Sequence, residues 1–238
     1  STVTTDATDP VIAITYVNDE DAKVEPNDKG YFNEPVTPTI TVTEANFVED
    51  NTNVEVKVDD DEVQLDELQW TDGKDGTWSC TLDRLVDEGD YSIEVTTTDA
   101  AGHAADIKTD EFTIDTTPIY FTVDWVGSDA EEPLEGEDDD TAYYPSARTA
   151  TVTPSETNFS FDEITVSTGS ETVQPVWNED EGAWIVSYPD DGSYRLQAYG
   201  VDDADNEACC YDSYSFVVDT QPPVLKVEFA DNDVAQAT

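Results

Sequence analysis

The residues of this chain best suited to chemistry are aspartates that recur at corresponding positions of two similar segments. Asp99 and Asp115 correspond to Asp202 and Asp219, and all four lie near the ends of predicted strands. Clustered carboxylate oxygens are the ligands that a hard cation such as Ca²⁺ prefers. The same aspartates can close turns by accepting hydrogen bonds from the backbone. The sequence therefore leaves two interpretations open, calcium at inter-domain junctions and solvated acid, and it assigns no metal ligand.

Two acidic runs are denser than these single aspartates. They are Val58–Glu62 and Glu135–Asp140, and they do not match each other. Neither fits the calcium loop of an EF-hand, which spaces its ligands around a glycine and ends in glutamate. Dense charge of one sign is typical of solvated loops. We therefore predict no cofactor beyond the calcium alternative.

His103 is the only histidine of the chain. No serine or cysteine lies at a recognisable spacing that would make it the base of a nucleophilic triad. Paired carboxylates can hydrolyse glycosidic bonds, but 57 acidic residues make chance pairs inevitable. We predict that His103 is a turn residue, that there is no catalytic residue, and that the protein is not an enzyme.

The charge of the chain restricts its partners. Its 238 residues include 57 acidic and 9 basic side chains, for a net charge of −48. Nucleic acid and anionic membrane surfaces would repel such a chain. No apolar run reaches the roughly 18 residues that a transmembrane helix needs, which predicts no membrane insertion within this segment. Cations, basic proteins and neutral glycans remain open as partners.

The three cysteines do not form a repeating framework. Cys80 lies in one segment, and Cys209 and Cys210 lie together in the other. Cysteines whose Cα atoms are more than about 7 Å apart cannot be bridged without backbone movement. We therefore predict no disulfide from Cys80 to either neighbour. A bond between Cys209 and Cys210 is left open.

One junction occurs three times along the chain. Asp6, Asp115 and Asp219 are each followed by turn residues with proline and then by apolar residues at alternate positions. The apolar triples are Ile12-Ile14-Tyr16, Phe121-Val123-Trp125 and Leu225-Val227-Phe229. Side chains at i, i+2 and i+4 share one face of a strand. The repeat is longer than the roughly 20–50 residues of solenoid units, and it predicts a string of small domains.

The two complete segments also agree between their junctions. Tyr31–Phe47 matches Tyr143–Phe159, and both end in Glu-x-Asn-Phe. Leu68–Leu82 matches Pro175–Tyr188, and each predicts a hairpin of two aromatic strands around an acidic turn. The corresponding tryptophans of these hairpins are Trp70 and Trp78 in the first segment and Trp177 and Trp184 in the second.

A glycine two residues before a tyrosine begins a long predicted strand in both segments. The tyrosines are Tyr91 and Tyr194, and a turn follows each strand at residues 99–103 and 202–206. This placement matches the tyrosine corner of immunoglobulin-like sandwiches, where the hydroxyl bonds to nearby backbone. We therefore expect each tyrosine to close such a corner.

The pattern as a whole predicts an all-β fold of tandem immunoglobulin-like β-sandwich domains, arranged as an elongated rod. Each segment shows about seven short strands separated by turn signals. The expected domains are 9–115 and 116–219. Residues 1–8 would end a preceding linker, and residues 220–238 would supply the first strand of a truncated third repeat.

These motifs resemble the bacterial immunoglobulin-like repeats best known from surface proteins of Gram-positive bacteria. The resemblance rests on "YFN…TITVTEANF", the Gly-x-Tyr corner, "TTDAAGHAA" and the Asp-Thr-Thr-Pro junction, in that order. It departs from the family at His103, where asparagine is usual, and at Asp205, where glycine is usual. The resemblance implies an exported protein at the cell surface or wall. It also implies that the Asn158–Ser160 glycosylation triplet stays unmodified.

The resemblance further implies a non-catalytic stalk or spacer whose partners are neighbouring repeats of the same chain. Two alternatives remain. The chain could be a ligand-binding adhesin module for a host protein or glycan, with the hairpin tryptophans as a sugar platform. It could also be an ancillary part of a secreted glycan-degrading enzyme. Tryptophans of a sandwich are more typical of its core.

Overall fold

The computed structural model describes residues 5–125, 134–135, 142–208, 211–212 and 215–228. Its contacts divide the chain into two compact units. The first unit comprises residues 1–120 with the loops 156–164 and 200–209, and the second comprises the remaining three segments. The first unit therefore contains two loops that belong to the second sequence repeat.

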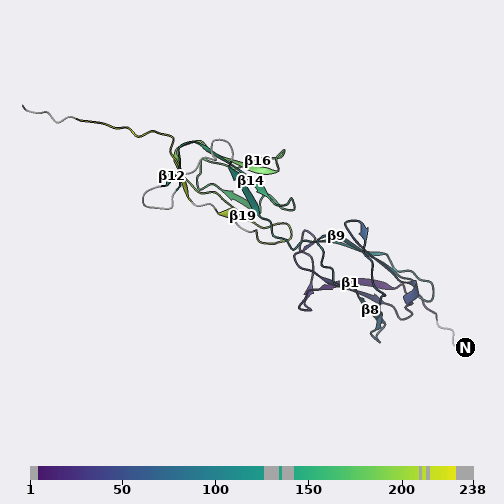
Figure 1. The fold of residues 1–238 in the computed structure, drawn as a ribbon. Coiled ribbons are helices and arrows are strands. Elements are labelled where there is room, and N and C mark those ends of the chain that lie inside the picture. Colours follow the sequence, from purple (N-terminus) through teal and green to yellow (C-terminus); the bar gives the residue numbers. More distant parts are fainter. Residues whose placement is uncertain (1–4, 126–133, 136–141, 209–210, 213–214, 229–238) are drawn as a thin grey trace, which may run out of the picture. The chain divides into compact units, whose positions relative to one another are not determined.

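The first unit is built from two five-stranded sheets whose neighbouring strands are mostly antiparallel (Figure 1). The first sheet has the order β2-β1-β4-β8-β7, with bounds Lys23–Val24, Val11–Val17, Thr37–Thr43, Thr77–Thr81 and Thr71–Asp72. The second has the order β3-β10-β9-β5-β6, with bounds Tyr31–Phe32, Lys108–Ile114, Gly89–Thr96, Asn53–Val58 and Asp61–Glu62. A single 3-10 turn, η1 (Glu49–Asn51), precedes β5.

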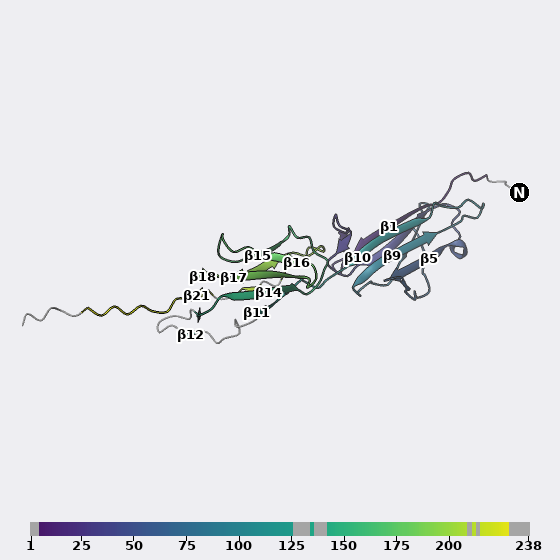
Figure 2. The same ribbon diagram turned by 90° about the horizontal axis from the view of Figure 1, so that it is seen from above.

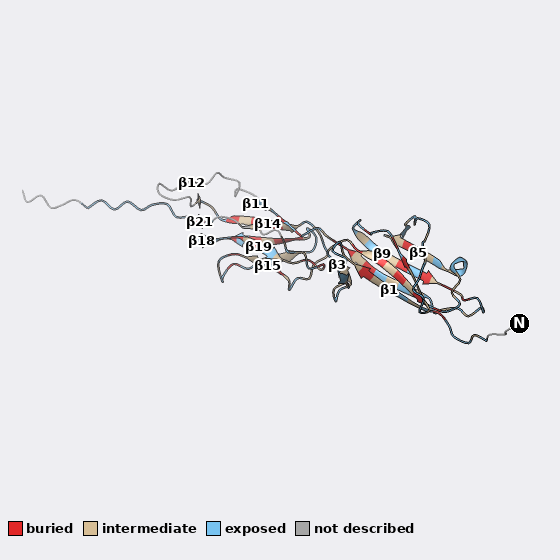
Figure 3. Cartoon of the chain, turned by 90° about the horizontal axis from the view of Figure 1, so that it is seen from below, coloured by how far each residue is buried: buried red, intermediate tan, exposed pale blue. Residues whose placement is uncertain are grey.

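Alternation along the strands sets the core of the first unit. In β4, Pro38, Ile40 and Val42 are buried, and the threonines between them are not. In β9, every second residue from Tyr91 to Val95 is buried in the same way. Successive side chains of a strand point to opposite faces, so these residues meet between the two sheets. Figure 3 shows buried residues alternating with intermediate and exposed ones along β9.

Aromatic rings fill one end of this core. Tyr16, Phe32 and Phe112 have ring centroids between 5.1 and 5.2 Å apart. The Tyr16 hydroxyl donates a hydrogen bond of 2.6 Å to Asp110 Oδ2, which lies on β10. Burial and this carboxylate raise the pKa of Tyr16. The bond ties the first strand of the repeat to its last strand, across the two sheets seen in Figure 2.

The second unit contains strands that correspond to those of the first, divided among three sheets. One sheet has the order β11-β14-β17-β16, with bounds Phe121–Trp125, Arg148–Pro154, Ala183–Tyr188 and Val176–Asn178. Another has the order β12-β13-β21-β18, with bounds Leu134–Glu135, Ala142–Tyr144, Phe216–Val218 and Gly192–Tyr194. A three-stranded sheet, β15-β19-β20, has bounds Ile164–Ser167, Gln197–Gly200 and Tyr211–Asp212.

The tyrosine corner predicted for each repeat is confirmed. The Tyr91 hydroxyl donates to the Asp87 carbonyl at 2.9 Å, and the Tyr194 hydroxyl donates to the Asp190 carbonyl at 2.9 Å. The predicted hairpins are confirmed as β7–β8 and β16–β17. Together with the paired sheets, these features establish tandem immunoglobulin-like β-sandwiches.

A buried arginine distinguishes the second core from the first. Arg148 is 6% exposed, and its guanidinium carbon lies 3.6 Å from the ring centroids of both Trp125 and Tyr144. A planar guanidinium stacks well on aromatic faces. The alternation of apolar residues in the sequence does not indicate this arrangement.

Charge is distributed unevenly over the first unit. The outward residues of β1, β4 and β8 form an uncharged surface, here called the threonine face: Val11, Ala13, Thr15, Val17, Thr37, Thr39, Thr41, Thr43, Thr77, Ser79 and Thr81. The outward side of the other sheet carries Glu55, Lys57, Asp90, Glu94 and Glu111. The outward residues of β1, β4 and β8 therefore include no acidic side chain, and the charged pair Lys23–Glu25 lies at β2, on the edge of the same sheet.

Candidate functional site

Two turns of the same geometry hold the aspartates singled out by the sequence. Asp99 Oδ1 accepts hydrogen bonds from the amides of Ala101 and His103, both at 2.8 Å. Asp202 Oδ1 accepts from the amides of Ala204 and Asn206, both at 2.9 Å. The prediction that His103 is a turn residue is therefore confirmed. Asp205 adopts φ 66°, the left-handed conformation that glycine takes at Gly102 with φ 95°.

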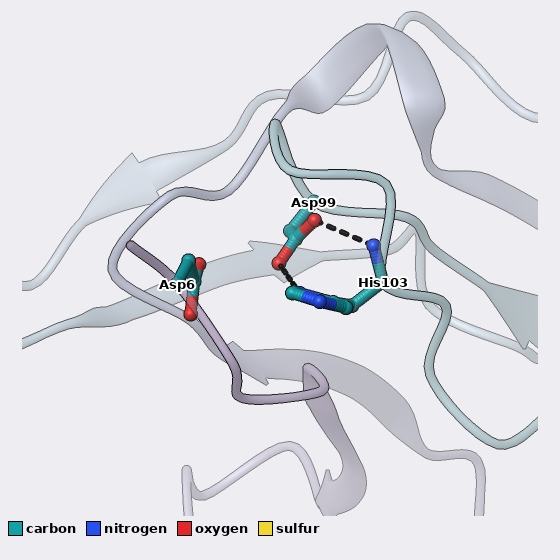
Figure 4. A group of neighbouring side chains, drawn as sticks. All are labelled: Asp6, Asp99 and His103. Atoms are coloured by element: carbon teal, nitrogen blue, oxygen red, sulfur yellow. Dashed lines mark hydrogen bonds and ion pairs between the residues drawn. The ribbon is translucent and has the colours of Figure 1, made fainter. Parts of the chain in front are cut away.

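The first turn brings Asp99 and His103 to Asp6. One ligand atom from each of the three side chains lies within 4.8 Å of the other two. Figure 4 shows Asp6, from the segment before β1, facing the Asp99–His103 pair. The His103 Nδ1 lies 3.1 Å from Asp99 Oδ2, and this hydrogen bond raises the pKa of His103. We call this group the histidine cluster.

Hydrogen bonds fix Asp6 within the histidine cluster. Its carboxylate accepts from the Thr8 amide at 3.1 Å and from Asn46 Nδ2 at 2.7 Å. These bonds lower the pKa of Asp6 to about 2. Asn46 is itself placed by Glu44, whose carboxylate accepts the Asn46 amide at 2.7 Å. The Glu-x-Asn-Phe motif thus positions the aspartate of the preceding junction.

The second turn brings together Asp115, Glu156 and Asp202. Ligand oxygens of these three carboxylates also lie within 4.8 Å of one another. Asp202 is fully buried, and Asp115 is 7% exposed. All three residues belong to the first compact unit. We call this group the carboxylate cluster.

Two asparagines hold Asp115 in the carboxylate cluster. The Asn158 amide nitrogen donates to Asp115 Oδ2, and Asn206 Nδ2 donates to the Asp115 carbonyl at 3.0 Å. Asn206 Nδ2 also lies 3.1 Å from Asp202 Oδ2. Two of these contacts repeat contacts of the histidine cluster: Asn158 takes the place of Asn46, and Asn206 takes the place of His103.

The carboxylate cluster leaves two buried oxygens without a hydrogen bond. They are Glu156 Oε1 and Asn158 Oδ1. A buried polar atom without a partner costs free energy comparable to a lost hydrogen bond. Burial, with repulsion from Asp115 and Asp202, raises the pKa of Glu156 to about 7. This donor set consists only of oxygens and carries three negative charges when ionised, which fits a hard divalent cation.

A further acidic residue accepts hydrogen bonds from the junction at the end of each repeat. Glu88 Oε1 accepts from the Thr116 amide at 3.0 Å and from the hydroxyls of Thr116 and Thr117, both at 2.7 Å. In the second unit, Asp191 Oδ1 accepts from the amide and the hydroxyl of Thr220, both at 2.7 Å. The junction is therefore bonded to the repeat that it leaves.

Lys29, one of the nine basic residues, lies among acidic groups of the first unit. Its ammonium contacts Glu163 Oε2, and it lies 2.9 Å from Asp203 Oδ1. These two carboxylates raise the pKa of Lys29. Asn27 Nδ2 adds bonds of 2.9 Å to the Asp203 carbonyl and to Asp205 Oδ2. The loops 156–164 and 200–209 are thereby fastened to the turn before β3.

The structure brings the predicted junction aspartates together with partners from other parts of the chain. Asp99 meets Asp6, and Asp115 meets Asp202, so each turn faces the junction that precedes its own repeat. Asp219 accepts the Gln221 amide at 3.1 Å and closes a turn. In the run 58–62, Asp59 and Asp60 have positive φ and Asp59 Oδ1 accepts the Asp90 amide. The run 135–140 lies almost wholly outside the described residues.

The hairpin tryptophans contact other aromatic rings, and only Trp184 among them is buried. The Phe47 ring lies 4.9 Å from that of Trp70 and stacks on that of Trp78 at 5.2 Å. Trp184 is 8% exposed, with its ring 4.6 Å from that of Trp177. Cys80 is a buried free thiol, while Cys209 and Cys210 lie outside the described residues.

Sequence reasoning missed Asp6, Glu156 and Glu88 as members of these groups. Asp6 and Glu156 stand in motifs that the repeat alignment identified, so their recurrence was the available signal. Their roles depend on which loops meet, and that is set by tertiary structure. Glu88 had no signal beyond an acidic residue preceding a glycine.

Residues 8–116 match the bacterial Ig-like domain family, Big_13. No curated protein matches the chain. The family match covers most of the first repeat, including the turn of His103 and Glu88. It ends at Thr116, directly after the junction aspartate.

Solved structures of tandem sandwiches are similar to this chain. The titin I-band fragment I67–I69 is 15% identical with a TM-score of 0.38, covering 90% of this chain and 66% of that one. The mouse nectin-like molecule 4 ectodomain is 12% identical with a TM-score of 0.37, covering 92% and 66%. The fibronectin(III)-like modules of Clostridium thermocellum CbhA are 12% identical with a TM-score of 0.31, covering 87% and 93%. The chain thus spans just under two thirds of the first two.

Among the described residues, no helix is long and apolar enough to cross a bilayer.

Proposed function

Residues 8–116 match the bacterial Ig-like domain family, and from this premise we propose that the chain is a non-catalytic stalk or spacer of an exported bacterial surface protein or adhesin. Its partners in this role are neighbouring repeats of the same chain. A spacer holds a distal part of the protein at a fixed distance and orientation. This function requires junctions that restrict rotation between neighbouring repeats.

The observation that carries this proposal is the bonding of junction residues 115–117 on both sides. Glu88 holds Thr116 and Thr117 to the repeat that they leave. Asn158 and Asn206 hold Asp115 to the loops of the repeat that follows. The proline at position 118 fixes φ and removes a backbone donor, which narrows the accessible conformations further.

The alternatives find less support. The sugar platform requires exposed tryptophans, whereas Trp184 is buried and the other three are half-buried against Phe47 or Trp184. A carboxylate pair for glycoside hydrolysis must flank a bound sugar. Asp202 and Asp115 are too deeply buried to do so. In the part of the chain that the structure describes, no specific contact favours an adhesin module for a host protein or an ancillary domain of a secreted enzyme.

The test is whether the two repeats tumble as one body. We expect residual dipolar couplings from both repeats to fit a single alignment tensor. Glu88→Ala should loosen the junction, so that the two repeats require separate tensors. Glu94→Ala removes an outward acidic residue of the neighbouring strand β9 and serves as the matched control. Separate tensors in the unaltered chain would contradict the proposal.

Export is tested separately. Antibodies raised against the chain should label intact cells of the source organism. Labelling only after the cells are permeabilised would contradict the proposed surface location.

We further propose that Ca²⁺ completes the carboxylate cluster. Asp115, Glu156 and Asp202 would hold the ion, with the side-chain oxygen of Asn158, and the ion would neutralise their mutual repulsion. Support comes from the two unpartnered buried oxygens and from the all-oxygen donor set. A cation held here would stiffen the same junction that Glu88 clasps.

Calcium is tested by melting in enough NaCl to saturate ionic screening. An ion bound by the native state alone adds RT ln(1 + [L]/Kd), or about 2.7 kcal/mol at a hundredfold excess over Kd. We expect the melting temperature to rise with CaCl₂, and Glu156→Gln to abolish the rise. Asp219→Asn alters the corresponding aspartate of the next junction and is the control. No rise in the unaltered chain would show that Asp115 only closes a turn.

A further inference from the structure

The histidine and carboxylate clusters share one scaffold but differ in one donor. The side chain four residues after each turn aspartate lies 3.1 Å from its Oδ2, through Nδ1 of His103 or Nδ2 of Asn206. The backbone bonds of the two turns agree within 0.1 Å. The exchange of histidine for asparagine therefore changes chemistry without changing the turn.

The histidine cluster has the features of a metal-binding group. Its three ligand atoms come from Asp6, Asp99 and His103 and lie within 4.8 Å of one another. The Asp99 side chain has no exposed surface, and its one ion-pair partner among the described residues is His103. Buried carboxylates are usually paired or bound to metal. The imidazole is 33% exposed, so the group is accessible from solvent.

The imidazole adds a ligand that an acidic cluster lacks. A neutral ring has a lone pair on one nitrogen, and histidine is the commonest protein ligand for transition metals. Among the described residues, His103 makes its side-chain hydrogen bond only through Nδ1, so the ring is held by this one bond. Figure 4 shows the ring next to Asp99, with Asp6 across from the pair. A metal ion that replaced the proton between His103 Nδ1 and Asp99 Oδ2 would remove only this one hydrogen bond.

We propose that Asp6, Asp99 and His103 bind a divalent transition-metal ion of the Zn²⁺ class. Each side chain gives one ligand, and water fills the remaining position on the exposed side. Mixed nitrogen and oxygen donors suit Zn²⁺, whereas Ca²⁺ takes oxygen ligands. The residue at positions 103 and 206 thus sets the class of ion that each cluster accepts. This inference does not depend on the calcium proposal.

The experiment exchanges the two residues. The background is the full chain with Cys209→Ser and Cys210→Ser, kept reduced, because thiolates also bind zinc. Zinc is titrated by calorimetry in high salt without calcium, and Co²⁺ absorption reports the ligand field. We expect one zinc site in the parent chain. His103→Asn should weaken it at least tenfold, and Asn206→His should add a second site.

Each result decides the proposal. No zinc site in the parent chain, or a site unaffected by His103→Asn, would overturn it. Failure of Asn206→His to add a site would overturn the claim that this position selects the ion. Loss of folding is monitored through the tyrosine corners by near-ultraviolet circular dichroism. The calcium response measured at Glu156 should survive His103→Asn, which keeps a failure here distinct from a failure of the calcium proposal.

Discussion

At the scale of single residues, the tyrosine corners are the clearest link from sequence to stability. Tyr91 and Tyr194 each donate one hydrogen bond to a carbonyl four residues upstream. A buried hydrogen bond of this kind contributes about 1 kcal/mol net. Tyr91→Phe should therefore lower the free energy of unfolding by about 1 kcal/mol in urea titrations. Tyr143→Phe, at an exposed tyrosine, should leave it unchanged; an equal loss in both would contradict the assignment.

The raised pKa of Glu156 predicts that the free energy of unfolding depends on pH when calcium is absent. Its pKa is raised from 4.5 to about 7 in the folded state, so folding favours the protonated acid. The stability that this group contributes is fully present below pH 4.5 and is lost as pH rises through 7. Calcium-free unfolding free energy should therefore fall across this window.

Glu156→Gln should remove that fall, because the amide stays neutral at every pH. The exposed Glu171→Gln serves as control and should keep the parent profile. The same Glu156→Gln chain should melt no lower than the parent without calcium, yet lose the calcium response. A profile unchanged by Glu156→Gln would show that another group is responsible.

At the scale of elements, the close approach of loops to strands depends on glycine. A Cβ at Gly200 would overlap the Glu163 carbonyl oxygen and crowd Ile164. Gly182 has φ 59° in the β16–β17 turn, and a Cβ there would meet open space. Gly182→Ala should cost only the left-handed strain of about 1–2 kcal/mol. Gly200→Ala should cost more in chemical denaturation, because backbone must move; a smaller cost would contradict this packing.

The elements also show how far the sequence could predict the fold. Alternation of Ile12, Ile14 and Tyr16 placed β1 with its buried face, because one residue of slip would turn that face to solvent. The tyrosine corners and hairpins followed from local signals. The place of Arg148 between aromatic rings did not, since Trp125 and Tyr144 belong to strands of two different sheets that only tertiary structure brings together. The two clusters could not be predicted for the same reason. The sequence identifies their aspartates, but it does not indicate which loops meet them.

At the scale of the whole molecule, the net charge of −48 is an energetic burden. Folding brings these charges closer than the unfolded chain does, so repulsion lowers stability at low ionic strength. The Debye length falls from about 30 Å at 0.01 M to about 3 Å at 1 M salt. The melting temperature should therefore climb with NaCl over this range. A flat melting temperature in calorimetry would show that the acidic residues are too well solvated to matter.

Because the threonine face is uncharged, the negative charge of the first unit is distributed asymmetrically. Counterions gather where carboxylates are dense, and in the first unit they gather over β5, β9 and β10 rather than over β1, β4 and β8. Where many such chains are crowded on one support, close approach is least costly across the side that has no ion cloud to compress. Neighbouring chains should then turn these bare sides toward each other and become ordered laterally, by avoidance of charge rather than by adhesion.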